Sequence, residues 1–172
     1  MTGALPAPQF GEWTVDDLPE VNWPRHEIID GSLHGTPMPH SLHQVAAQLL
    51  AQALNAEAPQ GLLAVGGVGI LRSGPPQRFL VPDVVVVQRS GLGDLAVTAD
   101  AVRLAVEITS PSTVLMDRGL KAELYAEMGV PAYWVLSPSG ESVSYEHASA
   151  FSSDGEAWMY KALETFRSSL LD

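Results

Sequence analysis

The chain has 172 residues, a net charge of −11 at pH 7 and no cysteine, with 46% hydrophobic and 17% charged residues. This composition is typical of a globular chain that buries a core, and it excludes a disordered chain, a disulfide-stabilised chain and a thiolate metal site. No apolar run approaches the roughly 20 residues that cross a bilayer, and the first residues carry no signal-peptide pattern. We therefore expect a cytoplasmic protein with a loose arm over residues 1–12 and a single domain over residues 13–172.

The first elements along the chain are a short helix, a hairpin and a long helix. Thr14 and the acids after it resemble the start of a helix, and Asp30-Gly31 between alternating segments predicts a hairpin turn. Residues 41–58 predict a helix. Its apolar residues recur at helical spacing and should form a buried face: Leu42, Val45, Ala46, Leu49, Leu50, Ala53 and Leu54.

Three strands are expected after this helix. Residues 62–72 predict one bent or bulged strand, because three glycines interrupt a β-type run. Residues 79–89 predict the next strand, with Pro82 at a sheet edge or a break in the ladder. Residues 103–110 predict a third strand, whose unbroken apolar character indicates burial on both faces.

The C-terminal part adds a helix and a strand. Residues 118–128 predict a helix with Asp117 as its N-cap, and residues 132–138 predict a fourth strand. A further short strand is expected over residues 157–163. The order helix, three strands, helix, strand predicts an α/β fold with a mixed sheet and helices on both of its faces.

Two acidic residues in apolar strands are the first candidates for a functional site. Asp83 opens the run VVVV and Glu107 lies in the third strand, so we expect their carboxylates to meet at one end of the sheet. They would share Mg²⁺ or Mn²⁺, with the backbone carbonyl of Ile108 as a third ligand. Lys121 lies one turn into the next helix and would orient the attacking water. Alternatively, Asp83 caps a turn and Lys121 pairs with Asp117.

The charge pattern leaves the question of nucleic acid open. A net negative charge argues against a general nucleic-acid binder, but a metal-dependent nuclease needs a local acidic cluster. Arg72, Arg78 and Arg89 lie in a stretch whose only acid is Asp83. They are either a place where a phosphate backbone docks or scattered solvated arginines.

The motifs HEIIDG, SLHQ, VPDVVVV, VEITSPST and MDRGLKAELYAEMGVPAYWVL, in this order, resemble the Uma-two family, named "putative restriction endonuclease". That family belongs to the PD-(D/E)XK nuclease superfamily, and the resemblance covers roughly residues 13–147. It implies a restriction-endonuclease-like mixed sheet with an αβββαβ core, which is the order read from the segments.

The resemblance also implies roles for individual residues. Asp83 matches the aspartate of the superfamily motif and Glu107 its second acidic position, whereas Thr109 stands where the simple motif has lysine. The lysine is then expected from the next helix, as Lys121. Glu27 matches an acidic residue of the family and would face the same cleft as an additional ligand or base.

Other positions keep two interpretations. His43 matches a histidine of the family and has either a role in the site or a local hydrogen bond. Ser110, Ser112 and Thr113 contact phosphate or cap the following helix, and Tyr125 is expected in the core.

Two functions of different classes follow. The first is a metal-dependent endonuclease that hydrolyses phosphodiester bonds in DNA, and the second is a catalytically inactive nuclease-fold module for binding or assembly. A phosphoesterase acting on small substrates would share the site of the first. A homodimer is expected, because cutting two strands favours two symmetric sites. Four aromatic residues near the C-terminus either cover the dimer interface or complete the core of the domain itself: Phe151, Trp158, Tyr160 and Phe166.

Overall fold

The computed structural model describes residues 9–19, 25–35, 39–93, 96–109, 117–136 and 157–171. Its elements in chain order are η1 (Val15–Asp17), β1 (His26–Ile29), β2 (Ser32–Gly35), α1 (Ser41–Glu57), β3 (Leu62–Val65), β4 (Gly69–Arg72), β5 (Arg78–Leu80), β6 (Val84–Gln88), η2 (Arg89–Gly91), β7 (Ala96–Thr98), η3 (Ala99–Ala101), β8 (Val102–Ile108), η4 (Asp117–Lys121), α3 (Ala122–Glu127), β9 (Tyr133–Leu136) and α4 (Ala157–Leu171). Of these, η4 is a π-helical turn. No helix within the described ranges has the length and apolar character of a membrane span.

The strands form two mixed sheets. One has the order β2-β1-β5-β4-β7 and the other the order β3-β6-β8-β9. In the second sheet, β3, β6 and β8 are antiparallel neighbours, and β9 joins β8 in parallel after α3. The order α1, β3, β6, β8, α3, β9 confirms the predicted αβββαβ core.

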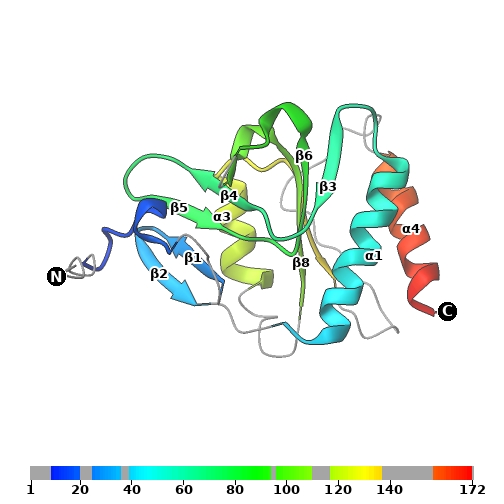
Figure 1. Cartoon of the computed structure of the whole chain (residues 1–172), viewed down its shortest axis with the longest axis horizontal. Coiled ribbons are helices and arrows are strands. Elements are labelled where there is room, and N and C mark those ends of the chain that lie inside the picture. Colours follow the sequence, from blue (N-terminus) through cyan, green and yellow to red (C-terminus); the bar gives the residue numbers. More distant parts are fainter. Residues whose placement is uncertain are drawn as a thin grey trace.

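The helices cover both faces of the four-stranded sheet (Figure 1). α1 and α4 lie side by side on one face, where they pack against Val84, Leu104 and Val106. α3 lies on the other face, between this sheet and the five-stranded one, and its Leu124 and Tyr125 belong to a core that includes strands of both sheets. Burial of β8 on both faces, predicted from its apolar run, is therefore confirmed.

The two runs predicted as single strands each form two strands in different sheets. Residues 62–72 divide into β3 and β4 at Gly66-Gly67, where Gly67 has a positive φ of 73°. Residues 79–89 divide into β5 and β6 around Pro82, so the predicted break in the ladder is confirmed. Glycine permits the turn and proline lacks the N–H that a ladder needs, which lets one run change sheets.

The N-terminal predictions are confirmed in part. Thr14 precedes only the three-residue 3-10 turn η1, and its amide and hydroxyl donate to Asp17. Asp30 and Gly31 turn between β1 and β2 with φ of 47° and 73°, the geometry of a tight hairpin. α1 forms as expected, but Leu42 and Val45 are 77% and 53% exposed instead of buried. Both precede Ala46, the first buried residue of α1.

The strand expected over residues 157–163 is wrong, because this segment forms α4. Its buried residues recur at the spacing of a helix: Met159, Ala162, Leu163 and Phe166. Phe166 completes the core with Trp158 packed against it, and Tyr160 lies 6.3 Å from Trp134 between ring centroids. Phe151 lies outside the described residues.

Candidate active site

Asp83 lies between β5 and β6, at the end of β8. Its amide donates to the carbonyl of Val106 at 3.0 Å, and its Oδ2 accepts from the amide of Ile108 at 2.8 Å. His43 Nε2 lies 3.0 Å from the same Oδ2, and Arg25 Nη1 lies 3.4 Å from Oδ1. The break at Pro82 thus leaves Asp83 outside both strands, β5 and β6. The end of β8 holds its backbone and its side chain.

The neighbours of Asp83 keep it ionised. Burial raises the pKa of Asp83, but the hydrogen bond and charge of His43, the Ile108 amide and the charge of Arg25 together hold it below its usual 3.8. The hydrogen bond to Asp83 raises the pKa of His43 above 6.5, against burial, and the backbone of Ile108 adds to this increase. His43 Nδ1 is buried and has no hydrogen-bond partner among the described residues. The Asp83 carboxylate therefore lies against both the imidazole of His43 and the guanidinium of Arg25.

Glu107 is buried in β8 and faces α3. Lys121 Nζ donates to Glu107 Oε1 at 2.8 Å, and the hydroxyl of Tyr125 donates to the same oxygen at 3.0 Å. Lys121 also donates to Glu27 Oε1 at 3.1 Å, and the amide of Val81 donates to that oxygen at 2.8 Å. One ammonium group is thus shared between two buried carboxylates.

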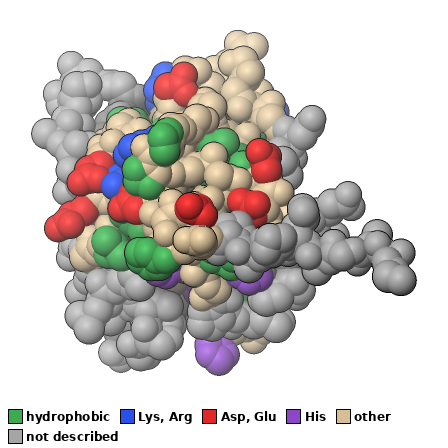
Figure 2. Space-filling view, turned by 90° about the vertical axis from the view of Figure 1, so that its left-hand side faces the viewer, with side chains coloured by type: hydrophobic (Ala, Val, Ile, Leu, Met, Phe, Trp, Pro, Cys, Tyr) green, Lys and Arg blue, Asp and Glu red, His purple; other side chains and the backbone are tan. Residues whose placement is uncertain are grey.

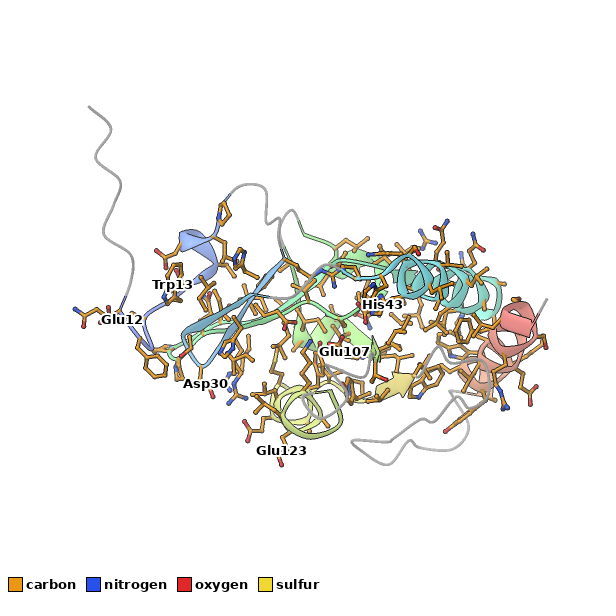
Figure 3. The ribbon with its side chains drawn as sticks, turned by 90° about the horizontal axis from the view of Figure 1, so that it is seen from below. Glu12, Trp13, Asp30, His43, Glu107 and Glu123 are labelled. Atoms are coloured by element: carbon orange, nitrogen blue, oxygen red, sulfur yellow. The ribbon has the colours of Figure 1, made fainter. Side chains whose placement is uncertain are left out.

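Each of these side chains comes from a different element. Alternation along β8 places Val106 and Ile108 toward α1 and Glu107 toward α3. The π-helical turn η4 ends at Lys121, and Tyr125 follows four residues later on the same helical face. Figure 3 shows Glu107 in the middle of the molecule and His43 near it at the start of α1, with Glu123 on the outer side of α3.

Tyr125 has a second function beyond the predicted packing. It is fully buried, and its ring lies 4.9 Å from that of Tyr133 between centroids. Burial and the charges of Glu107 and Glu27 raise its pKa well above 10, so the phenol stays neutral and donates a hydrogen bond to Glu107. This bond was not predicted from the sequence, although the i, i+4 spacing from Lys121 was a usable signal.

The structure brings together most of the side chains that the sequence singled out. Glu27, Glu107 and Lys121 contact one another directly, and Asp83 binds the backbone of the residue that follows Glu107. Across the described ranges, no group of three or more His, Asp or Glu residues has the arrangement of a metal cluster. The predicted metal ligands are Asp83, Glu107 and the Ile108 carbonyl. Only two of them are acidic side chains, fewer than the three of such a group, so this ligand set stays a prediction. Arg25, which contacts Asp83, was also missed.

The remaining candidates have other positions. Thr109 is buried at the end of β8, where its amide donates to the carbonyl of Leu136 at 2.7 Å. Arg78 is held by Asp30 and Glu127 at 2.5 and 2.6 Å, so it links the β1–β2 turn to α3 and is not available to a phosphate. The predictions for the hydroxyl residues Ser110, Ser112 and Thr113 fall outside the described part of the chain, as does the side chain of Asp117.

Comparison with known proteins supports the fold and identifies the family. A crystal structure from Anabaena variabilis ATCC 29413, described as "a putative nuclease belonging to DUF820", superposes with a TM-score of 0.66 at 18% identity. The match covers 89% of this chain and 94% of that one, and at this identity it shows a shared fold. Among curated proteins, none matches. The family model Uma2, described as "Putative restriction endonuclease", matches residues 8–156, and the chain belongs to this family.

Proposed function

We propose that the chain is a metal-dependent endonuclease that hydrolyses phosphodiester bonds in DNA. One arrangement carries the proposal. Asp83 and Glu107 are held at the same end of β8, Asp83 by the amide of the residue that follows Glu107, and Lys121 donates to Glu107 at 2.8 Å. An acid, an acid and a lysine from three elements are thus assembled at one strand end.

Asp83, Glu107 and the Ile108 carbonyl would hold Mg²⁺ or Mn²⁺. The donor set fits, because these ions prefer oxygen ligands, keep several waters and need only one or two carboxylates. The neighbours of Asp83 support this fit, because its carboxylate already lies against the guanidinium of Arg25 and the imidazole of His43, and its pKa is held below 3.8. When bound, the ion would lower the pKa of a water and stabilise charge on a phosphoryl oxygen.

The side chains around Glu107 set the position of the ammonium group. Glu107 and Glu27 hold Lys121 Nζ between them, and the Val81 amide fixes Glu27. Lys121 would orient the attacking water and neutralise developing negative charge. Glu27 is accessory in this proposal, because it positions Lys121.

The alternative of an inactive binding module rests on Thr109 at the lysine position of the motif. The ammonium group of Lys121 lies 2.8 Å from Glu107, which supplies the cation that Thr109 lacks and favours the enzyme. A phosphoesterase acting on small substrates would use the same groups. A single domain over residues 13–172, a homodimer and a cytoplasmic location belong to the proposal as well.

The test measures metal binding and cleavage separately. Melting temperature would be followed with Mn²⁺ or Mg²⁺, and plasmid cleavage with the same ions, in the wild type, Asp83→Asn and Glu107→Gln. Glu123→Gln is the matched control, because it makes the same chemical change at an exposed position of α3.

The proposal expects a metal-dependent rise in melting temperature and nicking of the plasmid in the wild type and Glu123→Gln. Both should disappear in Asp83→Asn and Glu107→Gln. Cleavage that survives in Glu107→Gln would contradict it. A metal-dependent shift without cleavage of plasmid, but with hydrolysis of a small phosphodiester, would favour the phosphoesterase.

A further inference from the structure

One long stretch of this acidic chain carries no carboxylate. None of its 20 acidic residues lies within residues 31–56. The stretch also contains no lysine or arginine, and its ionisable side chains are those of His34, His40 and His43. In a chain with a net charge of −11, residues 31–56 are therefore an exception to the general negative charge, as are residues 58–82, which lie farther along the chain and also carry no acid.

The acid-free stretch folds as β2 and α1, on two sides of the candidate site. His34 pairs with Glu27 across β1 and β2, so the two side chains lie on the same face of the sheet. His43 contacts Asp83 from the first turn of α1, and Arg25 contacts it from the residue before β1. We call Arg25, His26, His34, His40 and His43 the site edge.

The surface around the site edge differs from the rest of the described face. In Figure 2 the histidines lie along the lower edge, whereas the Asp and Glu side chains lie above them. The carboxylates nearest the edge are those of Glu27, Asp83 and Glu107. Their side chains are at most 9% exposed, and they accept hydrogen bonds from cationic or amide donors. A polyanion is therefore repelled less at the site edge than at the acidic surface above it.

We propose that the site edge and the first turn of α1 bind the phosphate backbone of the DNA strand that the site cuts. The inference rests on the proposed function and assigns a surface to its substrate. The exposed donors His34, His40 and Gln44 contact phosphate oxygens, as uncharged side chains commonly do in protein–DNA complexes. Because none of these three donors is a lysine or an arginine, their contacts release few counterions and add little salt dependence.

The experiment moves the same charge between the two ends of α1. The double variant His40→Glu/Gln44→Glu adds two acids at the site edge, and Gln52→Glu/Gln60→Glu adds two exposed acids near the other end. Fluorescence anisotropy would give the Kd for a labelled DNA duplex in EDTA, where no cleavage occurs. A third double variant, His40→Lys/Gln44→Lys, reverses the sign.

The site-edge acids should weaken binding about tenfold, and the distant acids should change Kd by less than about twofold. The lysine variant should tighten binding and steepen the slope of log Kd against log salt by about 0.9 for each lysine that reaches a phosphate. Equal weakening by both acidic variants would overturn the inference, because net charge alone would then explain it.

Two further outcomes separate this inference from the proposed function. Binding that follows the expected pattern, without metal-dependent cleavage, would leave the edge as a DNA-binding surface and overturn the nuclease. A wild type that shows the metal-dependent shift but binds no duplex would overturn only the edge. The surface could instead bind a second copy of the chain, and light scattering tests this alternative. If the site-edge acids turn a dimer into a monomer and leave the Kd for DNA unchanged, the inference is overturned.

Discussion

The two carboxylates at the end of β8 are neutralised in different ways. Glu107 shares Lys121 with Glu27 and also accepts from Tyr125, and all four side chains are buried. Asp83 instead has His43 and Arg25 as partners, whose side chains are 16% and 18% exposed. One half of the site is enclosed between α3 and the sheets, and in the other half the partners of the carboxylate are partly exposed.

This difference assigns the two halves different tasks. A charge enclosed in the core cannot lose its partner without a large cost, so the Glu107 half is held in one arrangement. The partners of Asp83 reach solvent. An incoming cation can therefore replace them at the Asp83 oxygens at a lower cost in free energy. Rigidity on one side and access on the other are what a metal-dependent site requires.

The largest effect is expected from removing the shared cation. Lys121→Met should lower the free energy of unfolding by about 3–5 kcal/mol, because two buried carboxylates would lose their counter-charge. Lys161→Met is the matched control, since Lys161 also lies 2.8 Å from a glutamate, Glu57, but is 67% exposed. It should cost less than about 1 kcal/mol. Denaturant unfolding measures both, and similar losses would remove the distinction between enclosed and exposed pairs.

A smaller effect is expected from the phenol that holds Glu107. Tyr125→Phe keeps the ring and removes the donor, so it should cost about 2 kcal/mol, as for other bonds to charged groups. A double-mutant cycle with Glu107→Gln isolates the bond. The loss should shrink in the Glu107→Gln background. If it is unchanged, the hydroxyl stabilises the protein through something other than Glu107.

The smallest effect is expected at the exposed half, as a dependence on pH. The raised pKa of His43 means that its stabilisation is complete below about 6.5 and is lost as pH rises through the folded-state value. The lowered pKa of Asp83 means that its stabilisation is present above about 3.8 and is lost as pH falls through its folded-state value. The pair therefore stabilises most between these two values.

Urea unfolding of wild type and His43→Gln from pH 5 to pH 9 checks this expectation. The stability difference between them should be about 1 kcal/mol near pH 5.5 and should decline toward pH 9. A difference that stays constant over this range would show that His43 acts through packing and not through its charge.

The sequence alone was sufficient for the core order and for most of the site. Apolar runs and helical spacing predicted α1, the three-strand meander, α3 and β9, because these depend on patterns within short segments. The carboxylates Asp83 and Glu107 were visible because acids in buried strands are rare, and Lys121 because only one other lysine, Lys161, occurs in the chain.

Tertiary structure alone decided the rest. Residues 79–89 divide between two sheets because their two halves pair with strands of different sheets. The local sequence pattern would be the same if both halves stayed in one sheet. The partners of Asp83 and Glu107 come from residues 14 to 58 positions away, so their identity depends on how distant elements pack. Local sequence thus determined which groups the candidate site contains. Long-range packing decided that Lys121 is shared by two buried acids, while Asp83 is paired with the partly exposed Arg25 and His43.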